Sequence, residues 1–129
     1  MSFQCQKHID SRPVLLVADD EPVVRDIVRS MAESAGYRVL LATNASEALR
    51  VCERSGSLLG AVLLDLHIPG MGQEATAQIQ QSSPHARVLI ITGGSVEDAA
   101  GCHAHDVLLK PFTISELHHA LSASMQGVA

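Results

Sequence analysis

Short apolar runs recur along the chain, and polar residues do not alternate with the apolar ones inside them. Runs of this kind are typical of parallel strands that are buried on both faces of a sheet. The sequence contains five of them: VLLVA at 14–18, RVLLA at 38–42, AVLLD at 61–65, RVLII at 87–91 and VLLK at 107–110. They predict the strands of an open, mostly parallel sheet.

Helical patterns separate these runs. After the first run, apolar residues recur at the spacing of one helix face, with Pro22 suited to the first turn and Gly36 to the stop. Asn44 and Glu47 form a capping pair for the next helix. Both features predict helices that follow strands directly.

Three further helices are expected. Thr113 and Glu116 form a capping box for the last one, and weaker patterns near 73–82 and 95–102 predict two others, the second of them short. Strands that alternate with helices in this way predict an α/β fold with helices on both faces of the sheet. No internal repeat or second domain is expected.

Composition and charge narrow the function classes. The chain has 129 residues, of which 47% are hydrophobic and 18% charged, which fits one compact domain (13–125) after a flexible arm (1–12). The net charge of −5 and the absence of a Lys/Arg cluster argue against nucleic acid or a membrane as the direct partner. No apolar run is long enough to span a bilayer, and three cysteines without a CxxC pair fit a reducing cytoplasm.

Polar residues gather where the predicted strands end. In open α/β sheets, ligands bind at the carboxyl ends of the strands. The residues at these ends are Asp19, Asp20, Asp65, Thr92 and Lys110. Carboxylates that meet at one edge repel, which favours a cation, and hard oxygen ligands suit Mg²⁺. A carboxylate nucleophile, an amine, a hydroxyl and a metal are the parts that position a transferring phosphoryl group.

Each residue alone also has a plainer interpretation. Asp19 and Asp20 fit a solvated helix start, Asp65 a loop cap, Thr92 a turn and Lys110 a surface lysine. Their joint placement at strand ends favours the chemical interpretation.

Several segments together resemble the motifs of response-regulator receiver domains. They are LLVADDEP, VLLDLHIPGM, VLIITGG and LLKPF, in the family's order and on the expected strands. The resemblance implies a flavodoxin-like fold with strand order 2-1-3-4-5. It also implies phosphoryl transfer to Asp65 from the phosphohistidine of a histidine kinase or a histidine phosphotransfer domain.

The resemblance further implies the roles of single residues. Asp20, Asp65 and the backbone carbonyl of His67 would hold Mg²⁺, with Asp19 assisting through water; we expect Glu21 to stay outside the site. Thr92 and Lys110 would bind the phosphoryl group and transmit the change, and the bond between Lys110 and Pro111 is often cis in this family. Gly93 would leave room for the phosphoryl group.

The chain departs from the family's pattern in three places. Gly72-Gln73 stands where an Asp-Gly pair is common, Val107 stands where a mobile aromatic is frequent, and the segment from Thr92 to Lys110 is short. We expect phosphotransfer to be retained and the output to be atypical. The seven histidines lack the spacing of a zinc site, and His67 is expected to contribute only its backbone carbonyl.

Other functions stay open from the sequence. A degenerate receiver would bind partners without phosphorylation. The altered loop and short helix favour it, whereas the intact acids, Thr92 and Lys110 count against it. A small phosphohydrolase with an aspartyl-phosphate intermediate would need an acid two residues after the nucleophile, where His67 stands. The chain is compatible with a free-standing regulator, with a receiver excised from a larger regulator or hybrid kinase, and with a homodimer.

Overall fold

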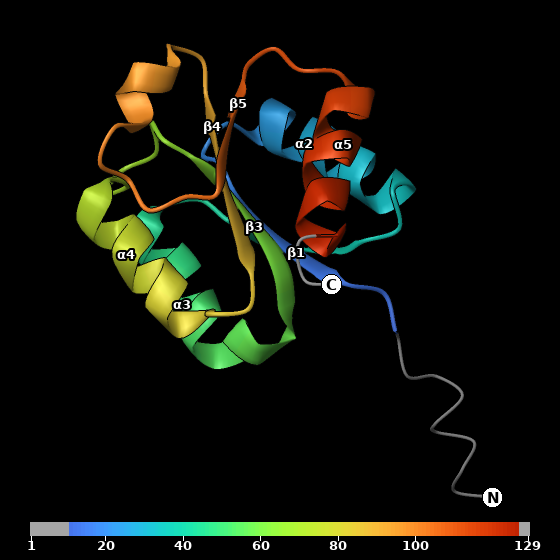
Figure 1. Ribbon diagram of the computed structural model, residues 1–129, viewed down its shortest axis with the longest axis horizontal. Coiled ribbons are helices and arrows are strands. Elements are labelled where there is room, and N and C mark those ends of the chain that lie inside the picture. Colours follow the sequence, from blue (N-terminus) through green and yellow to red (C-terminus); the bar gives the residue numbers. More distant parts are fainter. Residues whose placement is uncertain (1–10, 127–129) are drawn as a thin grey trace, which may run out of the picture.

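The computed structural model describes residues 11–126, so the predicted arm (1–12) falls almost wholly outside the described part of the chain. Strands alternate with helices along it (Figure 1). The strands are β1 (Val14–Ala18), β2 (Arg38–Ala42), β3 (Leu59–Asp65), β4 (Arg87–Thr92) and β5 (Asp106–Leu109). The α-helices are α2 (Pro22–Ser34), α3 (Ala45–Ser55), α4 (Gln73–Ser82) and α5 (Ile114–Gln126), and the 3-10 helices are η1 (Gly56–Leu58) and η2 (Val96–Ala99).

The strands form one parallel sheet in the order β2-β1-β3-β4-β5, which confirms the predicted flavodoxin-like topology. Each predicted apolar run forms a strand, but burial on both faces holds only for the central strands, since the edge strands β2 and β5 are half-exposed. All five residues of β1 are buried, as are all but the first of β4. All five carboxyl ends therefore point to the same edge.

Successive strand residues divide the core into two clusters. Leu15, Val17 and Leu63 face the layer formed by α2 and α5, whereas Leu16 and Val62 face the layer formed by α3 and α4 (Figure 1). This alternation is the two-residue period of a β-strand. The molecule is thus a three-layer sandwich, as predicted. No helix within residues 11–126 combines the length and the apolar character that crossing a membrane requires.

The predicted helix boundaries are confirmed at their polar ends. Asn44 Oδ1 accepts the Glu47 N–H at 2.8 Å at the start of α3. At the start of α5, Thr113 Oγ1 accepts the Glu116 N–H at 3.0 Å, and the Glu116 carboxylate accepts the Thr113 N–H at 2.8 Å. Gly36, at φ 98°, follows α2 in the left-handed conformation that glycine adopts without a steric penalty.

The prediction of an α-helix near 95–102 is wrong. The segment folds into η2, because the Ser95–Asp98 capping box closes one turn and Gly101, at φ 81°, redirects the chain soon afterwards. The loop that follows rests on the first turn of α4 instead. Gln73 Nε2 donates to the Ala100 carbonyl at 3.4 Å, and Thr76 Oγ1 accepts the His103 N–H at 2.9 Å. Among residues 11–126, four α-helices rather than five cover the sheet.

Candidate functional site

The sheet edge at the carboxyl ends of the strands collects most of the predicted site residues. Asp19 follows β1, Asp65 ends β3, Thr92 ends β4 and Lys110 follows β5. Asp19, Asp65 and Thr92 are buried, with 0%, 2% and 0% of their surface exposed. Buried polar groups require partners, so their contacts define the chemistry of this edge.

Lys110 joins the two buried carboxylates. Its Nζ lies 3.2 Å from Asp19 Oδ2 and 3.1 Å from Asp65 Oδ2, and Glu21 Oε1 lies 4.0 Å away. The second oxygen of each buried carboxylate accepts a backbone N–H at 3.0 Å, from Glu21 for Asp19 and from His67 for Asp65. One amine thus faces three carboxylates, and the group carries excess negative charge.

Burial and charge shift the pKa values of this group. Burial is the main cause that raises the pKa of Asp19, and the nearby Asp65 carboxylate adds to it, while the Glu21 N–H and Lys110 act in the opposite direction. Burial alone would lower the pKa of Lys110, but its contacts with Asp65 and Asp19 outweigh this and raise it. The lysine is therefore charged at neutral pH and sits as the counter-ion of the two buried acids.

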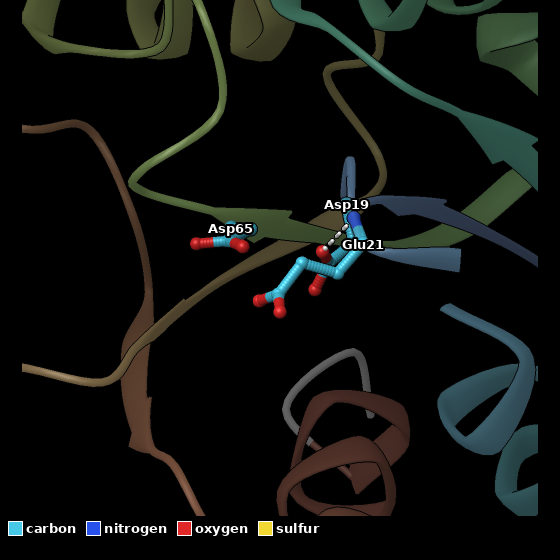
Figure 2. A group of neighbouring side chains, drawn as sticks. All are labelled: Asp19, Glu21 and Asp65. Carbon is cyan, nitrogen blue, oxygen red and sulfur yellow. Dashed lines mark hydrogen bonds between the residues drawn. The ribbon is translucent and has the colours of Figure 1, made fainter. Parts of the chain in front are cut away.

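A cation would find three oxygen ligands here. One carboxylate oxygen from each of Asp19, Glu21 and Asp65 lies within 4.8 Å of the others. Figure 2 shows the Glu21 side chain extending from the turn after Asp19 toward Asp65. Asp20, which the resemblance implied as a direct ligand, is exposed and does not belong to this group, whereas Glu21, expected outside the site, does.

The turn after β1 explains why Glu21 lies in this group. Asp19 Oδ1 accepts the N–H of Glu21 two residues later, which is the hydrogen bond of an Asx turn. Its signal in the sequence is an aspartate at a strand end just before a helix that begins with proline. The pattern of acids alone does not specify which of the next two side chains faces the site.

His67 contributes its side chain as well as its backbone. Its Nε2 lies 3.1 Å from Thr92 Oγ1, and the same hydroxyl oxygen accepts the Gly94 N–H at 3.1 Å. The expectation that only the His67 carbonyl matters missed this contact. It arises because β3 and β4 are neighbours in the sheet and their ends lie side by side.

The remaining predicted positions surround the phosphoacceptor candidate. A Cβ added at Gly93 would meet no atom within 4 Å, so the site is open there, whereas a Cβ at Gly94 would collide with the Asp98 carboxylate. The peptide bond between Lys110 and Pro111 is cis. The Lys110 N–H donates to the Thr92 carbonyl at 2.8 Å, which ties the ends of β4 and β5 together.

The three departures from the family pattern have defined places. Gly72 precedes α4, and its carbonyl accepts the Thr76 hydroxyl at 2.9 Å. Gln73 reaches the loop after η2, as described above. Val107 is half-buried and lines a groove of about 580 Å³ beside η2. The altered loop and the short β4–β5 connection thus meet at the start of α4.

Known proteins resemble this chain in sequence. Residues 15–122 match the family model of the response regulator receiver domain. The transcriptional regulatory protein AruR of Pseudomonas aeruginosa is 34% identical over 113 residues, which cover 81% of this chain and 46% of that protein. The probable transcriptional regulatory protein TcrX of Mycobacterium tuberculosis is 32% identical over 126 residues, or 93% of this chain and 53% of that protein. The chain spans about half the length of these curated relatives.

Solved structures resemble it in fold. The receiver domain of the sensor histidine kinase PA1611 from Pseudomonas aeruginosa, with a magnesium ion coordinated in its active-site cleft, has a TM-score of 0.82 at 27% identity, covering 90% of this chain and 99% of that one. A response regulator from Burkholderia pseudomallei, with a phosphorylated aspartic acid and a calcium ion, has a TM-score of 0.75 at 28% identity, covering 89% and 69%. Since sequence and fold agree over nearly all of the described residues, the chain belongs to the family of response regulator receiver domains.

Proposed function

We propose that this receiver domain accepts a phosphoryl group on Asp65 from the phosphohistidine of a histidine kinase or a histidine phosphotransfer domain. The observation that carries the proposal is a buried carboxylate that contacts an amine at 3.1 Å at the edge where the strands end. Lys110 is placed to neutralise charge on the incoming group. Thr92 supplies a hydroxyl close by.

The proposed transfer is a displacement at phosphorus. An Asp65 carboxylate oxygen attacks, the bond between the donor nitrogen and phosphorus breaks, and its electron pair returns to the imidazole of the donor. The product is an acyl phosphate on Asp65. Positioning and electrostatic stabilisation supply most of the catalysis in such reactions, and Lys110 and Thr92 would provide both.

The oxygen ligands at the edge fit Mg²⁺. This ion prefers carboxylate oxygens and keeps several waters, and Asp19, Glu21 and Asp65 offer such oxygens within 4.8 Å of one another. Bound there, Mg²⁺ would neutralise the excess negative charge of the site and of the phosphoryl oxygens. The roles of Asp20 and of the His67 carbonyl as ligands remain predictions.

The donor's docking surface is the second part of the proposal. An apolar groove of about 370 Å³ opens beside Lys110 and is lined by Val24, Ile27, Val28, Met31, Lys110, Pro111 and Phe112. Ile27 and Val23 on α2 are 49% and 71% exposed. A helix that carries phosphohistidine must pack next to Asp65 to deliver its phosphoryl group. Lys110 both lines this groove and contacts Asp65, so the groove offers apolar contacts to a helix bound beside the acceptor. Histidine kinases present their phosphohistidine in the cytoplasm, so the proposal places the chain there.

The test is phosphorylation by a small phosphodonor such as acetyl phosphate, read out by intact-protein mass spectrometry. The wild-type chain should gain the mass of one phosphoryl group in the presence of Mg²⁺ and lose it in hydroxylamine, as acyl phosphates do. Asp65→Asn should gain none, while Asp106→Asn, an exposed aspartate at the start of β5, should behave like the wild type.

Three outcomes would count against the proposal. Equal incorporation into Asp65→Asn would place the acceptor elsewhere. No incorporation into the wild type, together with no binding of beryllofluoride and Mg²⁺, would favour a degenerate receiver that acts without phosphorylation. Steady turnover of a phosphate ester would instead revive a phosphohydrolase, although His67 stands where that enzyme class needs an acid.

A further inference from the structure

The His67 ring has no part in the transfer proposed above, yet it contacts a residue that does. Its Nε2 lies 3.1 Å from Thr92 Oγ1, and its backbone N–H donates to Asp65 Oδ1 at 3.0 Å. His67 is exposed, whereas Thr92 is fully buried. One residue at the mouth of the site thus bridges the phosphoacceptor candidate and the hydroxyl that would bind the phosphoryl group.

The hydrogen-bonding capacity of Thr92 limits what its hydroxyl can do. A hydroxyl has one hydrogen to donate and two lone pairs that accept. Thr92 Oγ1 already accepts the Gly94 N–H at 3.1 Å. Accepting a hydrogen bond polarises the O–H group and makes it a better donor. With Nε2 of His67 carrying no hydrogen, the tautomer we infer for the resting site, Thr92 donates its hydrogen to that nitrogen.

From this we infer that His67 is a positioning residue that holds Thr92 in the unphosphorylated state. A phosphoryl oxygen can only accept hydrogen bonds, so Thr92 must withdraw its hydrogen from the His67 ring before it can bind a phosphoryl group on Asp65. The ring contact belongs to the unphosphorylated site, and a contact made in only one of two states shifts the population toward that state. His67 therefore opposes activation. This inference rests on the proposed function, because it assumes that the phosphoryl group forms on Asp65.

The strength of this restraint follows from the hydrogen bond that the His67 ring makes to Thr92. A neutral hydrogen bond contributes about 0.5–1.5 kcal/mol net, which corresponds to a factor of about two to ten in an equilibrium constant. Removing the ring should raise affinity for the phosphorylated-state mimic by this factor. It should leave Asp19, Lys110 and the fold in place, because the His67 side chain is exposed and its only hydrogen bond shown in the described residues is to Thr92.

The test is a titration with beryllofluoride in excess Mg²⁺, which mimics an aspartyl phosphate. His67→Ala should bind about two- to tenfold tighter than the wild type. His67→Gln, whose amide reaches a position close to that of Nε2, should restore wild-type affinity. His85→Ala removes an exposed histidine between α4 and β4 and should change nothing.

Thr92→Val provides the decisive background. It removes the hydroxyl, so adding His67→Ala to it should have no further effect on the affinity. The Gly94 amide gives a spectroscopic readout, because its N–H bonds the same hydroxyl. Its NMR signal should move in the same direction on His67→Ala and on addition of beryllofluoride to the wild type.

The outcomes separate the two proposals. If the wild type binds no beryllofluoride, the phosphoacceptor proposal fails. If the wild type binds it but His67→Ala binds equally or more weakly, or changes the affinity equally in the Thr92→Val background, then His67 does not restrain Thr92 and only this inference is overturned.

Discussion

Replacing Lys110 by methionine removes the amine that, among residues 11–126, contacts the buried acids of the site. Methionine keeps much of the length and the apolar stem of lysine but carries no charge. Asp19 and Asp65, which now contact Nζ at 3.2 Å and 3.1 Å, would face each other without a counter-ion. We expect Lys110→Met to fold but to be less stable than the wild type at neutral pH and without metal.

The structure sets the size of this loss. Oxygens of Asp19 and Asp65 lie within 4.8 Å, where two unit charges repel by about 3.5 kcal/mol at an effective dielectric constant of about 20. The backbone N–H groups that bind the two carboxylates remain, and water can enter because the Lys110 side chain is 19% exposed. The free energy of unfolding should therefore fall by about 2–3 kcal/mol, somewhat less than for a fully buried pair.

Urea unfolding followed by circular dichroism measures this change, since the chain has no tryptophan and only one tyrosine for fluorescence. The midpoint should fall with an unchanged slope. Lys110→Arg, which keeps the charge, should retain most of the stability. Saturating Mg²⁺ should return part of the loss by binding the folded state alone. Equal stability of Lys110→Met and the wild type at neutral pH would refute the claim that this amine balances the acids.

The pH dependence of the same pair of proteins follows from the pKa of Lys110. Because its pKa is raised above the ordinary 10.5, the stabilisation by the amine is fully present below that value. It is lost as the pH rises through the raised pKa. The difference in free energy of unfolding between wild type and Lys110→Met should accordingly hold through neutral pH and disappear in strong alkali.

Three further predictions test other parts of the site and its support. Burial raises the pKa of Asp19 above 3.8, so the contribution of Asp19 to stability is largest below that value and falls as the pH rises through the folded pKa. The stability of Asp19→Asn relative to the wild type should therefore increase from acid to neutral pH, as measured by urea titrations. Gly94→Ala should lower the free energy of unfolding by about 0.5–2 kcal/mol, because the new Cβ would displace the Asp98 carboxylate that caps η2. Gly93→Ala places its Cβ in open space and should lower the free energy of unfolding by less than about 0.5 kcal/mol. Equal losses in the two variants would contradict this. Thr113→Ala removes the cap of α5 and should lower the stability measured by thermal unfolding by about 1 kcal/mol. Ser115→Ala, at an exposed position on the same helix, should lower it little. A reversed order would exclude the capping role.

The sheet and the location of the site could be predicted because they depend on patterns that are visible in the amino-acid sequence itself. Parallel strands buried on both faces must be apolar throughout, so VLLVA and AVLLD can be identified without knowledge of their neighbours. Once the strands are parallel, their carboxyl ends share one edge. The convergence of Asp19, Asp65 and Lys110 then follows from topology alone.

The finer contacts of the site could not be predicted, because they depend on how side chains from different strands meet. The Asx turn after β1 determines whether the side chain of Asp20 or that of Glu21 faces Asp65, and these two residues are adjacent in the sequence. The contact between His67 and Thr92 requires two strand ends to be adjacent in a known register. The prediction of an α-helix near 95–102 was wrong for a different reason. The helical pattern there covers only a short segment, and the Ser95–Asp98 capping box and Gly101 end the helix after one turn.

The ion pair between Asp19 and Lys110 joins residues that are 91 positions apart and that directly follow β1 and β5. During synthesis, the acids of β1 and β3 leave the ribosome long before their counter-ion does. A nascent or truncated chain that ends before β5 carries the repulsion without the amine that relieves it. The amine that balances the buried acids is therefore supplied late in synthesis, after β5, and until then the acids depend on water or a cation to offset their repulsion.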